Sequence, residues 1–310
     1  MNSTNKYGLI YPPFLHKNSK VAIVSPSGRI ADDLLQGMCK RLKNWGVLPV
    51  CGKYADESCG RFAGTEKQRL TDLQWALDAP DIDAIFCSRG GYGCVHLIDK
   101  LNWKRFHESP KWLIGYSDIT ILLETINLQG FASIHAPMAR HFSESREEDD
   151  AMIFLQKLLF GEDLKYRLPA HSLNRYGKSE GILTGGNLSI ICSLRGTVFD
   201  QIRSGRILFI EDTGEEPYRI ERMMYSLKLS GILGELSGLI IGQFSDYTED
   251  LLMLNSVYEI IANTVAEYAY PVCFDFPVGH VTRNYPLMCG GKYSFEVNAD
   301  ETELYTLCTL

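Results

Sequence analysis

The sequence predicts an α/β protein made of two domains, and three observations support this prediction. Short apolar segments alternate with segments whose apolar residues recur at helical spacing, which is typical of a mostly parallel sheet covered by helices on both faces. The 310 residues exceed what one hydrophobic core usually supports. A polar stretch without sustained periodicity separates the two halves. We therefore expect one domain over residues 1–162, a linker over 163–180 and a second domain over 181–310.

The first half begins with a regular series of strand and helix units. A β-branched run at Val21–Val24 predicts a buried strand that ends in a turn at Pro26 and Gly28. The next segment predicts a helix that ends before Gly46. Its apolar residues at helical spacing are Leu35, Met38, Leu42 and Trp45. The remaining strands are expected in the segments VLPVC, DAIFCS, WLIGYS and FASIH.

Three further helices complete the first half. Thr65 and Gln68 have the spacing of a capping box, so a helix is expected to start there. Its apolar face contains Leu70, Leu73 and Leu77. The other two helices are expected from about residue 118 to 128 and from about 151 to 160.

The second half restarts the same alternation. Strands are expected in GILTGG, RILFIED and GLIIGQF, and helices in NLSIICSLRG, from near Pro217, and from about Asp250 to Tyr268. Shorter strands close the chain. Because no internal repeat is visible, we expect two different α/β units that face each other, with a cleft between them as the default ligand site.

The composition favours a small molecule or a peptide as the ligand. Hydrophobic residues make up 45% of the chain and charged residues 22%, which argues against extensive disorder. The formal charge of -7 gives no basic footprint, so neither nucleic acid nor an anionic membrane is an expected partner. The first residues lack a signal-peptide core and no apolar run approaches the ~20 residues that span a bilayer. A cytoplasmic protein is therefore expected.

The nine cysteines are expected to be reduced thiols. They are odd in number and fall singly along the chain, which favours a reducing cytoplasm over a disulfide framework. The sequence contains no C-x-x-C, no H-E-x-x-H and no clustered histidine pair, so neither a metal nor another cofactor is expected.

The candidate nucleophile is Ser117, which follows the apolar segment that ends at Gly115 and precedes an expected helix. A tight turn between a strand and a helix lifts the serine hydroxyl clear of the backbone. The next amide N–H, that of Asp118, could stabilise an oxyanion at the helix N-terminus. The alternative is that Ser117 only caps the helix, because serine is a favoured N-cap residue. The segment also departs from G-x-S-x-G.

A second glycine-containing loop, SRGGYG, is expected at the same carboxyl edge of the sheet, where ligands bind in open α/β sheets. Consecutive glycines allow backbone amides to approach a ligand, so Gly90 or Gly91 could complete an oxyanion hole. Arg89 could bind a carboxylate. The alternative is an ordinary loop, and the loop lacks the Lys-Ser/Thr of a phosphate-binding loop.

Acidic residues of the second half are candidates to orient a histidine. Glu211 and Asp212 end an apolar strand, and one of them could face the cleft. Glu215 and Glu216 precede Pro217, so they are expected to stabilise the first turn of a helix.

The candidate general base is His280, which lies in a glycine-containing loop after a short strand, in the half opposite the candidate nucleophile. His135, at the end of FASIH, is the competing candidate. The other five histidines have no comparable setting. A single histidine is more often structural than catalytic, and this alternative stays open.

Six segments, in order along the chain, carry a family resemblance: SRGGYG, IGYSD, TGGNL, LFIED, PYRIERM and FPVGH. Together they resemble the serine LD-carboxypeptidase family, which includes muramoyltetrapeptide carboxypeptidases and microcin-immunity peptidases, over residues 20 to 300. The resemblance implies an N-terminal Rossmann-like domain with a parallel sheet and a C-terminal swivelling α/β domain. It places the active site at the interdomain cleft.

The resemblance also assigns roles to individual residues. Ser117 matches the family nucleophile, His280 the base and Glu211 the carboxylate that orients the base. The backbone amides of Asp118 and of Gly90 or Gly91 would then form the oxyanion hole. Arg89 or Arg283 is the candidate for the carboxylate of the substrate.

The activity implied by the resemblance is metal-independent removal of the terminal D-alanine from a murein tetrapeptide in cell-wall recycling. The cleaved bond follows the L-centre of meso-diaminopimelate or L-lysine, and a homodimer is expected. Two alternatives stay open: a microcin-immunity peptidase acting on a peptidyl-adenylate analogue, and a two-domain binding protein without chemistry.

Overall fold

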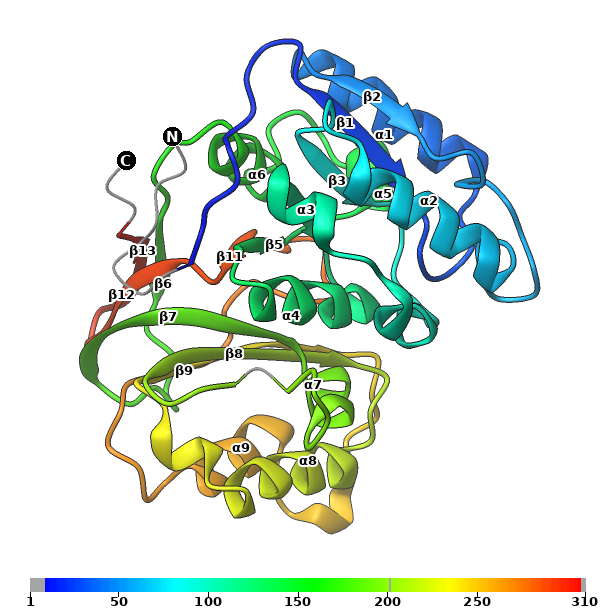
Figure 1. Ribbon diagram of the computed structural model, residues 1–310. Helices are drawn as coiled ribbons and strands as arrows, with labels where there is room; N and C mark the ends of the chain where they lie inside the picture. The colour runs from blue at the N-terminus through cyan, green and yellow to red at the C-terminus, as the bar shows by residue number, and fades with distance from the viewer. Residues whose placement is uncertain (1–8, 201, 308–310) are drawn as a thin grey trace. The chain divides into compact units, whose positions relative to one another are not determined.

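The computed structural model describes residues 9–200 and 202–307, which fall into two compact units (Figure 1). The N-terminal unit lies within Met1–Glu162 and includes Tyr285–Met288, and the C-terminal unit lies within Asp163–Asn284 and Cys289–Leu310. Each unit contains one large sheet and a set of helices. The predicted two-domain α/β fold is therefore confirmed.

The N-terminal unit is built on a six-stranded sheet with the order β11-β5-β4-β3-β1-β2. The neighbours from β2 to β5 pair in parallel, as the alternation of strands and helices predicts. The strand order turns back between β1 and β3, and ligands bind at the carboxyl ends of strands at such a switch point. The strands are β1 (Lys20–Val24), β2 (Leu48–Cys51), β3 (Ala84–Cys87), β4 (Trp112–Gly115), β5 (Ser133–His135) and β11 (Leu287–Cys289).

The helices of this unit begin and end where local sequence directs. The helix α1 buries the predicted apolar stripe, and the chain leaves it through Gly46, whose φ of 85° suits glycine. The helix α2 begins with the predicted capping box of Thr65 and Gln68. The α-helices are α1 (Asp32–Asn44), α2 (Glu66–Asp78), α3 (Lys104–Glu108), α4 (Thr120–Leu128), α5 (Ala139–Glu144) and α6 (Asp150–Leu159).

The C-terminal unit is built on a seven-stranded mixed sheet with the order β10-β9-β8-β7-β12-β13-β6. The strands β7 to β10 pair in parallel, and β12, β13 and β6 add antiparallel. Figure 1 shows α7, α8 and α9 on one face of β7, β8 and β9. They bury a common apolar core there. The elements are β6 (Lys165–Pro169), β7 (Gly177–Asn187), α7 (Leu188–Leu194), β8 (Arg206–Thr213), α8 (Pro217–Leu229), β9 (Gly238–Ser245), α9 (Val257–Thr264), β10 (Val272–Cys273), β12 (Lys292–Val297) and β13 (Glu301–Thr306).

The segment 163–180, for which the sequence predicted a linker, contains β6 and the first residues of β7. The strand β6 pairs with β13 at the edge of the C-terminal sheet, with Tyr166 opposite Leu304. Both of these side chains are buried. Sequence periodicity did not predict this strand because most of its side chains are exposed and its composition is largely polar.

The long helix expected from Asp250 to Tyr268 is shorter in the structure. The helix α9 begins after Ser256, which forms a capping box with Glu259, and ends at Thr264. Leu254, just before it, has a φ of 60°, which no helix residue adopts. Among residues 9–200 and 202–307, every helix falls short of the length and apolar character needed to cross a membrane.

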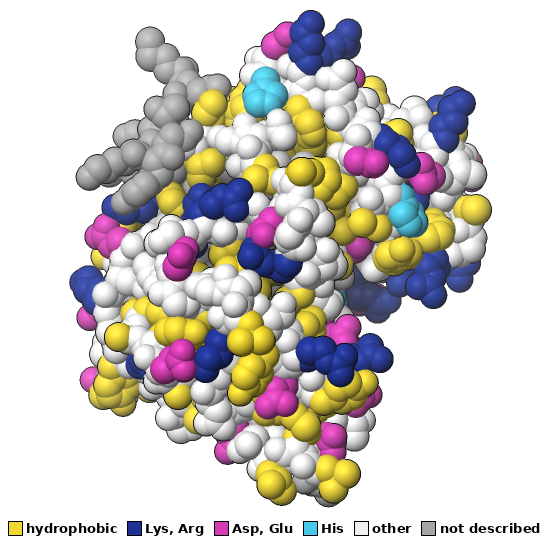
Figure 2. All heavy atoms as spheres, turned by 60° about the horizontal axis from the view of Figure 1, so that its bottom comes forward, with side chains coloured by type: hydrophobic (Ala, Val, Ile, Leu, Met, Phe, Trp, Pro, Cys, Tyr) yellow, Lys and Arg dark blue, Asp and Glu magenta, His cyan; other side chains and the backbone are white. Residues whose placement is uncertain are grey.

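Charged side chains are dispersed over the face drawn in Figure 2. Lys and Arg side chains are interspersed with acidic and apolar ones on this face. The whole sequence has 31 Lys and Arg residues against 38 Asp and Glu residues.

Candidate functional site

Three loops meet at the carboxyl edge of the N-terminal sheet, after β1, β3 and β4. The Gly28 N–H donates to the Gly90 carbonyl at 3.0 Å, which joins the first two loops. The hydroxyls of Ser25 and Ser88 form a buried hydrogen bond of 2.6 Å at the base of the same loops. The predicted loop SRGGYG therefore lies at the switch point of the sheet.

Ser117 lies at this edge, two residues after the end of β4 and shortly before α4. Its φ of 65° lies in the left-handed region, which a non-glycine residue adopts only when its surroundings hold it there. A single 3-10 turn, Ser117–Ile119, then leads into α4, and no side-chain capping hydrogen bond is made at the start of either element. The geometry of Ser117 is therefore that of a strained strand-to-helix turn, and the helix-capping alternative has no hydrogen bond to support it.

Gly90 packs against Ser117 so closely that no side chain fits between them. A Cβ atom at position 90 would lie 2.7 Å from Ser117 Cβ and 2.9 Å from Ser117 Oγ. Gly91 is exposed, has a φ of 117° and lies over Gly28. Of the two glycines predicted for an oxyanion hole, Gly90 is the one in contact with the serine.

Asp118 has a buried carboxylate that ties the loops together, a role that the sequence did not predict. Its Oδ2 accepts a hydrogen bond from Ser27 Oγ at 2.6 Å and from the Cys94 N–H at 2.9 Å. Its Oδ1 is buried without a hydrogen-bond partner among the described residues. Because the side chain is held on both sides, the Asp118 backbone next to Ser117 is held as well.

Arg69 is a second positioning residue that sequence reasoning missed. It is 3% exposed, and its Nη1 donates to the carbonyls of Pro26 at 2.6 Å and Gly93 at 2.9 Å. Its guanidinium lies over the Phe62 ring, and burial lowers its pKa. A signal was present, because Arg69 lies four residues before Leu73 on the apolar face of α2, where a charged residue needs partners.

The two arginines proposed for the substrate carboxylate are both exposed. Arg89 donates from Nη1 to the Arg29 carbonyl at 2.6 Å and so helps to hold the loop after β1. Arg283 belongs to the C-terminal unit, in the loop between β10 and β11.

In the C-terminal unit, Glu211 and His280 form a hydrogen-bonded pair. His280 Nδ1 lies 2.8 Å from Glu211 Oε2, with the glutamate side chain fully buried and the histidine side chain 18% exposed. Gly279 makes this approach possible, because a Cβ at that position would lie 2.9 Å from Glu211 Oε2. The Gly279 N–H is held in turn by Asn284 Oδ1 at 2.9 Å.

Burial and charge act in opposite directions on the pKa of His280. Burial lowers it, whereas the hydrogen bond to Glu211 and the charges of Glu211, Asp212 and Asp246 raise it. The balance lifts the pKa of His280 above its usual value of 6.5. A histidine held in this way has a fixed ring orientation and a stabilised cation, which are the properties of a general base oriented by a carboxylate.

The other acids of the segment have different partners. Asp212 accepts hydrogen bonds from Asn187 Nδ2 at 2.8 Å, the Ser189 N–H at 2.8 Å and the Thr213 N–H at 2.9 Å, so it holds the start of α7. Burial, followed by the charge of Glu211, raises its pKa to about 6. Glu215 pairs with Arg219 across one turn at 3.6 Å, and Glu216 is exposed at the N-cap of α8. Geometry therefore leaves Glu211 as the partner of the histidine.

His135, the competing histidine, is fully buried within β5, and its ring lies 5.7 Å from the Tyr116 ring. A ring without exposed surface cannot reach a substrate in this conformation. Its setting is that of a core residue.

We predict that Asp212→Ala destabilises the protein by about 2–4 kcal/mol, because it leaves two donors at the start of α7 and the Thr213 N–H without their acceptor. Urea denaturation at pH 7 measures the change. Glu216→Ala, an exposed glutamate nearby, is the control and should cost less than about 0.5 kcal/mol. Equal stability of Asp212→Ala and the parent would show that these donors find water instead.

The N-terminal unit contains a serine with a left-handed backbone beside a glycine loop, and the C-terminal unit contains a buried carboxylate hydrogen-bonded to a histidine. Models of the N-terminal and C-terminal domains of LD-carboxypeptidases match residues 21–136 and 180–295. The chain therefore belongs to the LD-carboxypeptidase family, a family of peptidases. This confirms the family resemblance.

Individual relatives resemble the chain over most of its length. A murein tetrapeptide carboxypeptidase of Pseudomonas aeruginosa is 34% identical over 278 residues, which cover 86% of this chain and 90% of the relative. The microcin C7 self-immunity protein MccF of Escherichia coli is 26% identical over 298 residues, which cover 85% and 86%. The crystal structure of a muramoyltetrapeptide carboxypeptidase from Oxalobacter formigenes matches with a TM-score of 0.85 at 27% identity, covering 93% of this chain and 98% of that chain.

Proposed function

We propose that this protein is a serine LD-carboxypeptidase that removes the terminal D-alanine of a murein tetrapeptide. The observation that carries the chemistry is the 2.8 Å hydrogen bond between Glu211 and His280, which provides an oriented base. The substrate class is supported by the Pseudomonas aeruginosa relative, which is named for murein tetrapeptide. The bond cleaved is the one between the L-centre of the diamino acid and D-alanine.

The proposed reaction passes through an acyl-enzyme on Ser117. With substrate bound, His280 must come within about 2.6–3.2 Å of Ser117 Oγ to take its proton. The serine then attacks the scissile carbonyl while Glu211 stabilises the imidazolium. His280 returns the proton to the departing amine of D-alanine, and water, activated by the same histidine, releases the shortened peptide.

The proposed oxyanion hole uses the backbone amides of Asp118 and Gly90, with Gly91 as the alternative to Gly90. Gly90 is favoured because it contacts Ser117 directly. The Asp118 carboxylate and the Gly90 carbonyl both accept hydrogen bonds from the loop after β1, which would restrict the two residues before substrate binds. Arg89 or Arg283 would bind the terminal carboxylate of the substrate.

The remaining proposals concern the setting of the enzyme. No step of the mechanism needs a metal. A cytoplasmic location suits the free thiols of the described cysteines, which a reducing compartment preserves. We also propose that the protein forms a homodimer.

A second candidate function is supported by the Escherichia coli relative, a microcin C7 self-immunity protein. That function would use the same three residues on a peptidyl-adenylate analogue. A third candidate is a binding protein that performs no chemistry.

The experiment that separates these functions follows D-alanine release by mass spectrometry. The purified protein is incubated with murein tetrapeptide that contains meso-diaminopimelate or L-lysine, with and without a chelator, and with aspartyl sulfamoyl adenosine in parallel. Release of D-alanine that persists with chelator supports the proposal. Cleavage of the adenylate analogue alone would favour the second function, and binding of either compound without cleavage would favour the third.

Gly90→Ala should lower kcat/KM by at least about 100-fold, because the new methyl group displaces Ser117 from its place. D-alanine release measures the rate, and circular dichroism checks the fold. Gly234→Ala is the matched control, since its Cβ would meet only Tyr268 Cε1 at 3.5 Å. Unchanged activity in Gly90→Ala would show that the serine moves without loss and would weaken the proposed oxyanion hole.

A further inference from the structure

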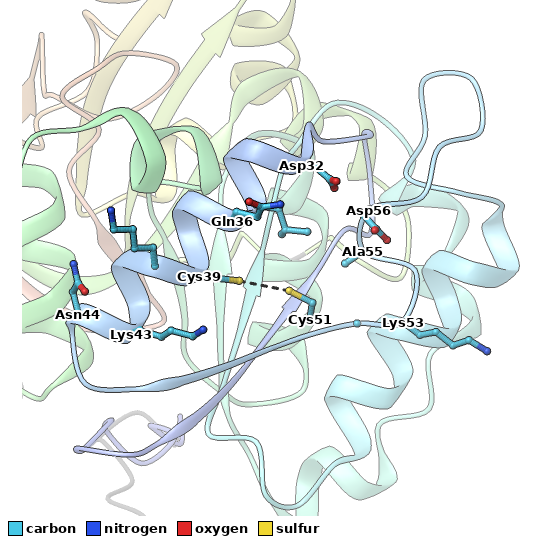
Figure 3. Close-up of a pocket in the computed structure, with 12 residues that line it drawn as sticks. Asp32, Gln36, Cys39, Lys43, Asn44, Cys51, Lys53, Ala55 and Asp56 are labelled. Carbon is cyan, nitrogen blue, oxygen red and sulfur yellow. Dashed lines mark hydrogen bonds between the residues drawn. The ribbon is translucent and has the colours of Figure 1, made fainter.

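Two cysteines of the N-terminal unit lie in contact, away from the groups proposed for catalysis. Cys39 belongs to α1 and Cys51 ends β2, and their Sγ atoms are 3.6 Å apart (Figure 3). Both are free thiols in the structure, Cys39 partly exposed and Cys51 exposed. At this distance the two sulfur atoms are in contact, so a small movement would bring them to the length of a disulfide bond.

The secondary structure explains why the two thiols meet. Cys39 follows Leu35 by four residues and precedes Leu42 by three, so it sits beside the buried stripe of α1. Cys51 is paired with Ile23 of β1, and β2 is the outer strand of its sheet. Side chains of a strand point to the two faces of its sheet, and on one face of β2 the Cys51 thiol contacts α1 through Cys39.

The thiols open into a pocket of about 660 Å³ between α1 and the chain after β2. Figure 3 shows the two sulfur atoms directed at each other, with Lys43 and Lys53 on the same pocket. Lys40 also lines it, and Asp32 and Asp56 lie at one end. Three lysines against two aspartates give the lining a net positive charge, which favours a reagent that carries carboxylates.

The surroundings of Cys51 disfavour its thiolate form. Although part of the residue is exposed, partial burial, the neighbouring Cys39 and the charge of Asp56 raise the pKa of Cys51 to about 12. Cys51 is therefore a thiol at neutral pH.

We propose that Cys39 and Cys51 form a dithiol site that reacts with small anionic disulfides and closes to an intramolecular disulfide. The Cys39 thiolate attacks one sulfur of the small disulfide, which breaks its S–S bond and releases one small thiolate. Cys51 Sγ then attacks Cys39 Sγ and expels the second small thiolate, which takes up the proton of the Cys51 thiol. Two protein thiols are oxidised by two electrons, and one small disulfide is reduced to two thiols.

The closure needs little movement. A disulfide has an S–S distance of about 2.05 Å, so the sulfurs must approach by about 1.5 Å, which side-chain rotation can supply. The bond would fasten α1 to the outer strand of the sheet. It would close a loop of residues 39–51, so we expect the melting temperature of the oxidised protein to rise by about 5–10 °C.

The segment that follows Cys51 is connected by hydrogen bonds to the loops around the candidate nucleophile. The chain after Cys51 reaches Ala55, whose carbonyl accepts a hydrogen bond from Ser25 Oγ at 2.6 Å. Ser25 in turn bonds Ser88, at the start of the SRGGYG loop. The dithiol site is thus connected to the carboxyl edge of the sheet without belonging to it.

Glutathione disulfide is the probe that tests the site, used on the full-length protein at pH 8. After alkylation of the remaining thiols, trypsin should give residues 30–40 and 44–53 as one linked pair, because the chain is cleaved after Arg29, Lys40, Lys43 and Lys53. We expect this link in most molecules, reversal by dithiothreitol, and the rise in melting temperature stated above.

Matched variants identify the link. Cys39→Ser and Cys51→Ser should each abolish it, whereas Cys59→Ser, an exposed cysteine of the same unit, should leave it unchanged. The proposal is overturned if both thiols remain open to alkylation, if glutathione persists on either cysteine of the parent protein, or if the link lowers the melting temperature.

Discussion

Ser117→Ala should lower kcat for D-alanine release by at least about 10⁴-fold while leaving substrate binding intact. The variant removes the proposed nucleophile, and enzymes with a serine triad lose several orders of magnitude when any member that moves the proton or attacks is deleted. Alanine differs from serine only by the hydroxyl, so the backbone at φ 65° faces the same strain. Rates are measured by mass spectrometry of D-alanine, and binding by calorimetry with the tetrapeptide.

The control for this variant is Ser193→Ala, an exposed serine on α7 whose hydroxyl donates to the Ile190 carbonyl within the same helix. It should keep the parent rate within about twofold. Activity within tenfold of the parent in Ser117→Ala would remove Ser117 as the nucleophile. Loss of binding together with loss of rate would instead indicate that the serine shapes the site.

Glu211→Gln should lower kcat by about 10³–10⁴-fold. The glutamine amide can donate to His280 Nδ1 and so leaves the ring proton on the nitrogen that must accept the Ser117 proton. The substitution keeps the size of the side chain, so the contact with Gly279 is retained. The measurement is again D-alanine release, now across a range of pH.

The pH profile separates an orienting role from a structural one. In the parent, kcat/KM should rise with pH through an apparent pKa above 6.5, because His280 must be neutral to act as a base and Glu211 raises its pKa. In Glu211→Gln the burial that lowers the pKa of His280 remains, whereas the hydrogen bond and charge that raise it are lost. The acid limb of the residual activity should therefore move to lower pH.

The pH dependence of protein stability provides a second test of the pair formed by Glu211 and His280. A histidine whose folded pKa lies above its unfolded value stabilises the fold fully at pH below the unfolded value, and this contribution is lost as pH rises through the folded pKa. Glu211→Gln should therefore cost more unfolding free energy at pH 5.5 than at pH 8.5. Urea denaturation at the two pH values gives the comparison.

Two controls belong to this experiment. Glu216→Gln, on the exposed N-cap of α8, should leave rate and profile unchanged. Asp212→Asn keeps the bond between Glu211 and His280 and should retain a rate within about tenfold of the parent. A larger loss in Asp212→Asn than in Glu211→Gln would transfer the orienting role to Asp212.

Sequence patterns predicted most elements of the fold because those elements depend on near neighbours. The apolar stripe of α1 and the capping box of α2 involve residues three or four positions apart, and both occur in the structure as expected. The strand β6 and the late start of α9 were missed. The first depends on pairing with β13, and the second on a left-handed residue at Leu254.

The candidate residues were predicted from their places at strand ends, but their partners were not. Ser27 and Arg69 escaped notice because their importance comes from bonds to Asp118, Pro26 and Gly93, in other loops. A charged residue on an apolar helix face was the one sequence signal for Arg69.

The sequence by itself determined the α/β class, the family, and a short list of residues at strand ends. Periodicity, helix caps and short motifs each depend on residues that are close together in the sequence. Only the tertiary structure showed which acid between 211 and 216 contacts His280, because the two residues of that pair are 69 positions apart, on β8 and in the loop between β10 and β11. It also decided that Gly90, not Gly91, contacts Ser117, since that depends on how adjacent parallel strands end at one edge.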